Sequence, residues 1–141
     1  MRKQRGTALI EFALVVPLIL VLTFTVIEMG RAVQRYNGAA KAVRDAVRYL
    51  SVQQQGTHQV EAANLIVYGN IAGTGPLLDP ALTINNVVAP SWATVGSNPI
   101  INTVTIKVSG YTFTPMVSSV FGASFPQIIF GDISATMRCP L

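Results

Sequence analysis

The hydrophobic residues of the chain are concentrated in one long run close to the N-terminus. Between Thr7 and Ile27 the only charged residue is Glu11. A helix needs about 20 apolar residues to cross a bilayer, and a helix satisfies its own backbone hydrogen bonds in lipid. The run therefore predicts one transmembrane helix. Pro17 lies inside it and removes a backbone hydrogen bond, which predicts a helix kink at this position.

The apolar pattern continues beyond this run with the period of an amphipathic helix. Apolar residues recur at steps of three and four from Val33 through Val43 to Leu50, which is the spacing of one helix face. Two interpretations stay open: this face packs on the chain's own domain, or it contacts neighbouring subunits. A second, short helix is expected at 59–68, where Gly69 is well placed to end it.

The C-terminal part of the chain changes to the residue types and alternation of β-strands. Strands are expected at 83–88, 103–108 and 133–137. Tyr111 and Phe113 are expected to continue the second strand beyond Gly110, and the helical spacing within 115–126 predicts a turn or two of helix. Together the elements predict an α+β fold, in which the transmembrane helix continues into the amphipathic helix and packs on a small antiparallel sheet.

The composition agrees with a membrane-inserted chain. Only 11% of the 141 residues are charged, against about 25% in soluble domains. The net charge of +4 could indicate nucleic-acid binding, but all of the ten basic residues except Lys107 and Arg138 flank the apolar run. Basic residues at such flanks contact lipid headgroups and set topology. Nucleic acid is therefore not expected as the primary ligand.

The orientation of the helix does not follow from charge alone. Three basic residues precede the apolar run and five follow it, so a simple count favours a cytoplasmic C-terminal side. The first three are packed directly beside the membrane, which favours a cytoplasmic N-terminus, and we adopt that orientation. Cleavage by a conventional signal peptidase is not expected, because the run is too long and no small-x-small site follows Ile27.

No combination of residues indicates catalysis. His58 is the single histidine and is expected to be a solvated residue at a helix start. Cys139 is the single cysteine, so it forms neither an internal disulfide nor a zinc site. The chain has no zinc, haem or P-loop motif. We therefore expect neither an enzyme nor a cofactor.

Glu11 is the unusual residue of the apolar run. A carboxylate within a membrane span costs free energy and is commonly functional. Its side chain either lies near the interface, where it reaches the headgroups or is protonated, or pairs with a positive group of another subunit. The residues before it favour the second interpretation, since a basic patch at 2–5 ends in Gly6, and Glu11 and Phe12 follow at a short distance.

In these residues the sequence resembles prepilins of the type IV family, whose leader is cut after a glycine and whose glutamate stands at the fifth mature position. The run from Gly6 to Val52 resembles more narrowly the TadE-like minor pilins, or pseudopilins, of tight-adherence (Tad/Flp) systems. The shared features are the glycine–glutamate–phenylalanine start, Pro17, Glu28 with Gly30-Arg31, and the Ala-rich stretch at 42–49. The resemblance implies a pilin-like fold with a leader at 1–6, a transmembrane helix at 7–30, a helical extension at 31–55 and an exported α+β domain at 56–141.

The resemblance also implies a function. A prepilin peptidase would cut between Gly6 and Thr7, creating an amine with a pKa near 8. Glu11 of one subunit would neutralise the amine of its neighbour and fix the subunit register. The implied partners are the peptidase, the major pilin, other minor pilins, the inner-membrane pilus platform and membrane lipid.

The implied location is the inner or cytoplasmic membrane, with the N-terminus in the cytoplasm and the C-terminal domain periplasmic or extracellular, or in the pilus. Pilus assembly, adhesion and biofilm formation would follow from these interactions. The alternative is a single-pass anchored binding or sensory domain that is never processed and works as a monomer.

Overall fold

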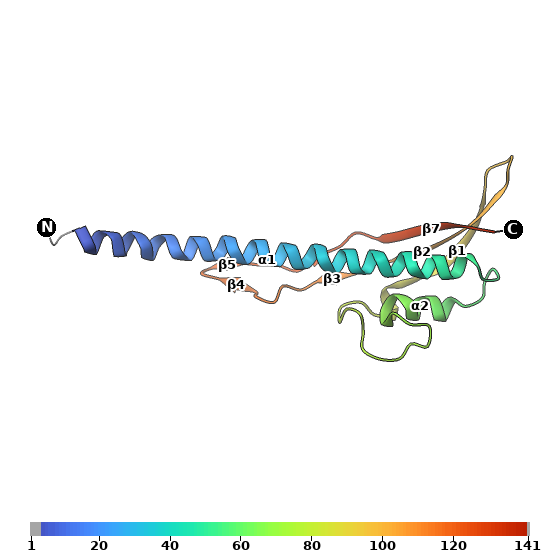
Figure 1. Cartoon of the computed structure of the whole chain (residues 1–141), viewed down its shortest axis with the longest axis horizontal. Coiled ribbons are helices and arrows are strands. Elements are labelled where there is room, and N and C mark those ends of the chain that lie inside the picture. Colours follow the sequence, from blue (N-terminus) through green and yellow to red (C-terminus); the bar gives the residue numbers. More distant parts are fainter. Residues whose placement is uncertain (1–3, 141) are drawn as a thin grey trace. The chain divides into compact units, whose positions relative to one another are not determined.

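The computed structural model describes residues 4–140, with side chains from Gly6 onward. Its first element is one continuous helix, α1 (Gln4–Ser51), which contains the predicted transmembrane segment 7–30 and residues 31–51 of the helical extension predicted at 31–55 (Figure 1). The helix continues through Pro17, and the kink stays a prediction. The most apolar stretch of α1 is not buried by the rest of the described chain. An exposed apolar helix of this length suggests a membrane anchor.

The chain divides into two compact units. We call the first the anchor unit; it contains α1 up to Val33 together with the segment Thr114–Gln127. The second, the sheet unit, contains Gln34–Phe113 and the described residues from Ile128 onward. Helix α1 therefore contributes its apolar part to the first unit and its amphipathic part to the second. Each unit is described by itself below.

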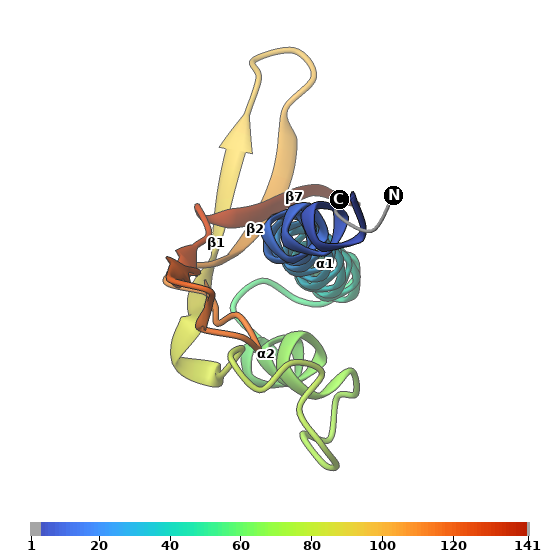
Figure 2. The same ribbon diagram turned by 90° about the vertical axis from the view of Figure 1, so that its left-hand side faces the viewer.

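The sheet unit is built on a three-stranded antiparallel sheet with the strand order β1-β2-β7. The strands are β1 (Val87–Val95), β2 (Ile101–Val108) and β7 (Ile133–Cys139). In the central strand, Val104 lies opposite Trp92 on one side and Met137 on the other. Figure 2, a view along α1, shows the sheet beside the helix and α2 (Gln59–Tyr68) below it. The predicted α+β fold class is confirmed.

The core of the sheet unit forms where alternate residues of β2 meet one face of α1. Val104, Ile106 and Val108 are fully buried, as the alternation of this strand predicts. The buried residues of the two helices that join them include Val43, Val47, Leu50 and Ile66. The apolar face of α1 therefore packs on the chain's own domain at these positions. Upstream, Val33 is 57% exposed and takes no part in this packing.

Helix α2 has the predicted bounds and the predicted end. Gly69 adopts a left-handed backbone with φ of 73°, and its N–H donates to the carbonyl of Leu65. Glycine is the residue that takes this conformation without a steric penalty. The buried residues of α2 are Ala62, Ile66 and Val67.

The strand predicted at 83–88 is wrong for most of its length. Ile84–Asn86 form a short 3-10 helix, η1, and β1 begins only at Val87. The Asn86 side chain accounts for the difference, because its Oδ1 accepts the N–H of Thr83 at 2.9 Å and its Nδ2 donates to the carbonyl of Ser109 at 3.2 Å. Local side-chain bonds of this kind compete with strand pairing.

Two further predictions after β2 are also wrong. Tyr111 and Phe113 do not extend β2, because Gly110 has a positive φ of 67° and turns the chain. Instead β3 (Thr112–Phe113) pairs with β6 (Ile128–Ile129). The helical turn expected within 115–126 is replaced by a short hairpin of β4 (Ser119–Val120) and β5 (Ala123–Ser124). Its two turn residues, Phe121 and Gly122, both have positive φ, which a right-handed helix cannot accommodate.

A polar cluster connects α1 to the loops of the sheet unit. The hydroxyl of Tyr111 donates to Asp79 Oδ2 at 2.9 Å, and Arg35 Nε on α1 lies 3.4 Å from the same oxygen. The guanidinium of Arg35 lies over the ring of Phe113 at 5.4 Å from its centroid. Tyr111 is almost completely buried. Burial, followed by its hydrogen bond to Asp79, raises the pKa of Tyr111 well above its ordinary value.

The raised pKa of Tyr111 predicts an alkaline weakening of the fold. The unfolded state loses the Tyr111 proton above about pH 10, while the folded state keeps it until its higher pKa is reached. The stabilisation is therefore complete below about pH 10 and falls by up to about 1.4 kcal/mol per pH unit above it. We expect Tyr111→Phe to reduce this alkaline slope in denaturant titrations of the full chain in detergent. Tyr68→Phe is the control, and equal slopes for both variants would contradict the prediction.

Candidate functional site

The residues predicted to direct processing lie together in the first turns of α1. Gly6 has open space where a side chain would be, since no atom lies within 4 Å of an added Cβ. Glycine at this position is therefore not required by packing within the described chain. Thr7 and Glu11 are one helical turn apart and share a face of α1. Of the predicted leader, residues 1–3 lie outside the described part of the chain.

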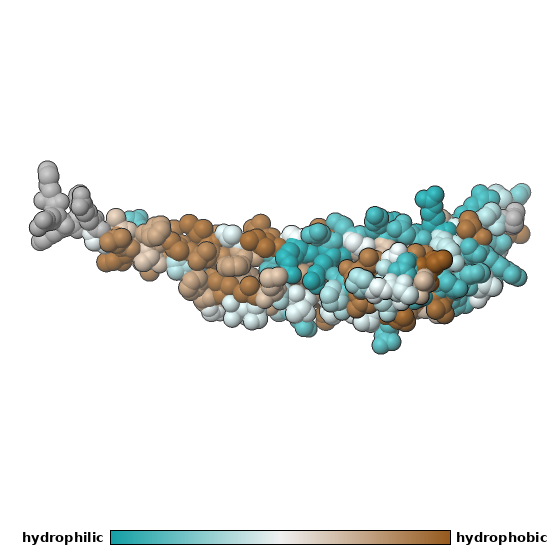
Figure 3. Space-filling view, turned by 60° about the horizontal axis from the view of Figure 1, so that its bottom comes forward, coloured by the Kyte–Doolittle hydropathy of each residue, from teal (hydrophilic) through white to brown (hydrophobic). Residues whose placement is uncertain are grey.

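Glu11 and Phe12 face away from the rest of the protein. Phe12 is 67% exposed and Glu11 is exposed as well. Among residues 6–140, whose side chains are described, the side chain of Glu11 takes part in no hydrogen bond or ion pair. The described chain thus leaves the carboxylate without compensation at a position where the surrounding helix surface is apolar. Brown, hydrophobic side chains gather along this part of α1 in the space-filling view (Figure 3).

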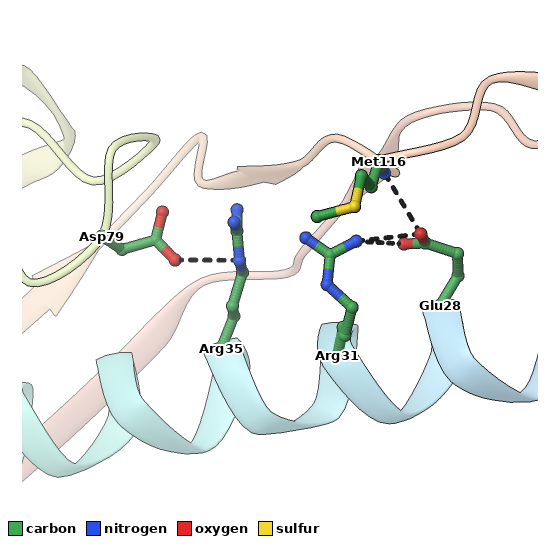
Figure 4. Close-up of polar contacts among 5 residues, drawn as sticks. All are labelled: Glu28, Arg31, Arg35, Asp79 and Met116. Carbon is green, nitrogen blue, oxygen red and sulfur yellow. Dashed lines mark hydrogen bonds and ion pairs between the residues drawn. The ribbon is translucent and has the colours of Figure 1, made fainter.

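A second carboxylate, Glu28, lies on α1 just beyond the apolar run, and it is satisfied within the chain. Its side chain is largely buried, and both of its carboxylate oxygens lie 2.8 Å from Nη1 of Arg31, one turn further along the helix (Figure 4). Oε1 also accepts the backbone N–H of Met116 at 3.2 Å. Charge-assisted hydrogen bonds of this kind are stronger than neutral ones. Glu28 therefore fixes the segment 114–127 to the helix within the anchor unit.

The segment 114–127 covers one stripe of α1. Val21, Phe24 and Glu28 follow each other at steps of three and four, and they are less exposed than their neighbours on the helix. The rest of the anchor unit is this segment, and Figure 1 shows β4 and β5 beside α1. Pro17 is half-buried and belongs to the same stripe. The other faces of the apolar helix stay uncovered by the described chain.

Sequence reasoning identified Glu28 as part of a motif but missed what it binds. Its partner is a backbone N–H, 88 positions away in the chain. A backbone donor leaves no residue-type signal in a sequence, and the segment around Met116 was expected to be helical. The sequence shows only that Glu28 and Arg31 are three residues apart on a helix, which indicates a local ion pair and no contact with the segment around Met116.

The described residues contain no constellation that resembles a metal centre. In the part of the chain with described structure, no group of three His, Cys, Asp or Glu side chains is placed to hold a metal ion. His58 is exposed at the start of α2, as predicted, and its Nδ1 lies 2.9 Å from the Thr57 hydroxyl. Cys139 is half-buried in β7 and forms no disulfide within the described chain.

Comparison with known protein families gives a match, and it covers the segment that contains Gly6, Glu11 and Glu28. A family model described as TadE-like protein matches residues 6–48. The N-terminal segment is TadE-like. The match covers about the first third of the chain and includes Gly6, Glu11 and the Glu28–Arg31 pair. It supports a protein associated with a tight-adherence pilus. Neither the curated proteins nor the solved structures include a significant match to this chain.

The contacts of Glu28 in this TadE-like segment predict a measurable change in dynamics. Glu28→Ala removes the acceptor of the Met116 N–H, and hydrogen bonds to charged groups are worth about 1.5–3 kcal/mol. We expect hydrogen exchange of the Met116 amide to become about 10- to 100-fold faster in the detergent-solubilised chain, with a smaller increase for Glu28→Gln. Glu61→Ala on α2 is the control. Unchanged exchange at Met116 in Glu28→Ala would show that the contact does not hold the segment.

Proposed function

We propose that the chain is a minor pilin, or pseudopilin, of a tight-adherence pilus, cut after Gly6 and then incorporated into the assembling fibre. The observation that carries the proposal is the TadE-like match over an apolar helix whose Glu11 has no partner in the described chain. On this proposal the partner of the carboxylate is the new N-terminal amine of a neighbouring subunit. Within the described part of the apolar run, no basic side chain accompanies Glu11. This is expected of a subunit whose Glu11 pairs with another subunit.

The position of the scissile peptide favours processing. Gly6 and Thr7 lie near the N-terminal end of the described part of α1, and both are exposed. The exposed Gly6 presents no side chain to the approaching enzyme. The peptidase chemistry belongs to the partner, and this chain supplies the substrate.

The electrostatics of the cut chain explain why Glu11 is needed. After cleavage the helix would begin at Thr7, so a cationic amine would stand at the positive end of the helix dipole. That arrangement is unfavourable in a low-dielectric environment unless an anion compensates it. Glu11 of a neighbouring subunit supplies this anion and receives compensation for its own burial. One ion pair would thereby set the axial stagger between adjacent helices.

The uncovered surface of α1 supplies the area for assembly. Leu14, Leu18 and Leu22 recur at four-residue steps and are more than half exposed. Before assembly this surface would contact lipid, and in the fibre it would contact the helices of the major pilin and of other minor pilins. We place the N-terminus in the cytoplasm and the sheet unit outside the membrane, with the platform of the inner membrane as a further partner. Adhesion and biofilm formation would be the cellular outcomes.

Processing is tested by the N-terminal sequence and intact mass of the protein recovered from membranes of cells with a competent prepilin peptidase. We expect a chain that begins at Thr7. Gly6→Phe should abolish processing, because a bulky side chain blocks access to the scissile bond. Gly30→Phe is the matched control, since Gly30 is also an exposed α1 glycine with open space around it. A wild-type chain that keeps its leader would instead favour an unprocessed anchored binding or sensory domain.

Assembly is tested separately with Glu11→Ala. The substitution leaves Gly6 and Thr7 unchanged, so we expect processing to continue. Co-purification with the major pilin should fall about tenfold or more, corresponding to the loss of roughly 1.4 kcal/mol or more in a water-excluded ion pair. Glu61→Ala serves as the control for removal of a carboxylate elsewhere. Normal co-purification of Glu11→Ala would refute the pairing role of Glu11.

A further inference from the structure

We propose that the segment Thr114–Gln127, named here the hairpin segment, inserts its tip into the headgroup–acyl boundary of the bilayer that α1 spans. The occupant of its exposed apolar surface would be membrane lipid. The inference concerns only the anchor unit. It requires α1 to cross a membrane, and it does not require processing or pilus assembly.

The first observation is the absence of charge. No Asp, Glu, Lys, Arg or His occurs between Lys107 and Asp132, a stretch that contains the whole hairpin segment. Charged side chains are the groups that resist transfer from water towards lipid. A surface segment without them moves to the membrane interface at little electrostatic cost.

The second observation is the exposure of its apolar side chains. Met116 is 78% exposed and Phe121 is 69% exposed. Phe121 occupies the hairpin turn with φ of 47°, beside Gly122 with φ of 84°. Turn positions with two positive φ values favour Asn and Gly, and a bulky residue there is an outlier. The phenyl ring obtains little burial from the described chain in return for this conformation, which points to a contact outside the chain.

The third observation is the position of the segment along α1. Glu28 holds Met116 at the end of the apolar run. From there the covered stripe continues back to Phe24 and Val21, inside the predicted membrane span. Seven helical residues correspond to about 10 Å, and amphipathic elements enter the interface to about 5–10 Å. The apolar surface of the hairpin segment is thus continuous with the surface of α1 that lipid covers.

Hydrogen bonding limits how deep the hairpin can lie. The strands β4 and β5 are paired only at Ser119 with Ser124 and at Val120 with Ala123, and the N–H of Phe125 donates to the carbonyl of Ser118. Their outer edges would be unsatisfied in the hydrocarbon centre, where open edges are not tolerated. The three serines and the free edges can bind water and headgroups at the boundary. The tip residue Phe121 then reaches the acyl chains.

The experiment places a tryptophan at the tip of the full-length chain. Trp92 is the single tryptophan, so Trp92→Phe removes the native tryptophan fluorescence. The substitution breaks no side-chain hydrogen bond, because the buried Nε1 of Trp92 has no partner within the described chain. Phe121→Trp and Met116→Trp are made in this background as two independent reporters. Val52→Trp is the control, because Val52 is also exposed and follows the far end of α1. All chains are reconstituted in phosphatidylcholine vesicles with brominated acyl chains.

We expect brominated lipid to quench the tryptophans at 121 and 116 at least about twofold more strongly than the tryptophan at 52, as expected for side chains at interfacial depth. Aqueous iodide should give the opposite order. Equal quenching by brominated lipid at all three positions overturns the inference. A tryptophan at 121 that escapes brominated lipid but becomes protected when purified major pilin is added also overturns it, and identifies a protein as the occupant.

These outcomes are independent of the proposed function. The N-terminal mass of the same preparations reports processing, so a processed chain with an unquenched tip refutes the membrane contact alone. A chain that keeps its leader in cells with a competent prepilin peptidase, but has a quenched tip, supports the membrane contact and contradicts the proposed processing. Failure of every variant to float with the vesicles would overturn the membrane contact, because α1 would then not be a membrane anchor.

Discussion

The structure depends on one helix that must suit two environments. Over its apolar part, α1 leaves its side chains exposed, as expected of a membrane anchor, while over its amphipathic part it buries Val43, Val47 and Leu50 in the core of the sheet unit. A helix provides this because its backbone hydrogen bonds are internal in either environment. The sheet and α2 need only cover one face of the second part. This explains why a chain with few charged residues still forms a conventional core in the sheet unit.

The two carboxylates of α1 differ in exposure and in their hydrogen-bond partners. Glu11 is exposed and without a partner in the described chain, whereas Glu28 is buried and receives donors from Arg31 and from the backbone of Met116. A buried charge is tolerated when its hydrogen-bonding capacity is used. The hydrogen-bond donors of Glu28 therefore come from its own chain, and they stabilise the anchor unit. Glu11 has no such donor in the described chain, and on the proposed function another subunit supplies its counter-charge.

Periodic features of the fold could be predicted from the sequence, and features that depend on individual bonds could not. The helices and the strands β2 and β7 repeat their apolar residues with a regular period, so their burial follows directly. The segment 83–88 has suitable residue types for a strand, but the side chain of Asn86 binds Thr83 and Ser109 and curls it into η1. Gly110 and the Phe121–Gly122 turn redirect the chain through positive φ values. The role of Glu28 depends on a backbone donor, which has no sequence signature.

Phe121 shows how a local energetic cost points to an external contact. A bulky residue in the left-handed region costs about 1–3 kcal/mol, and full burial of a phenylalanine side chain returns about 1.5–3 kcal/mol. Because Phe121 is 69% exposed, contacts within the described chain provide only a small part of this free energy of burial. Glycine or asparagine would form the same turn with less strain and greater solubility. Burial of the Phe121 ring in an apolar environment would offset the backbone strain. In the proposed arrangement this environment is the lipid that surrounds α1 in the anchor unit.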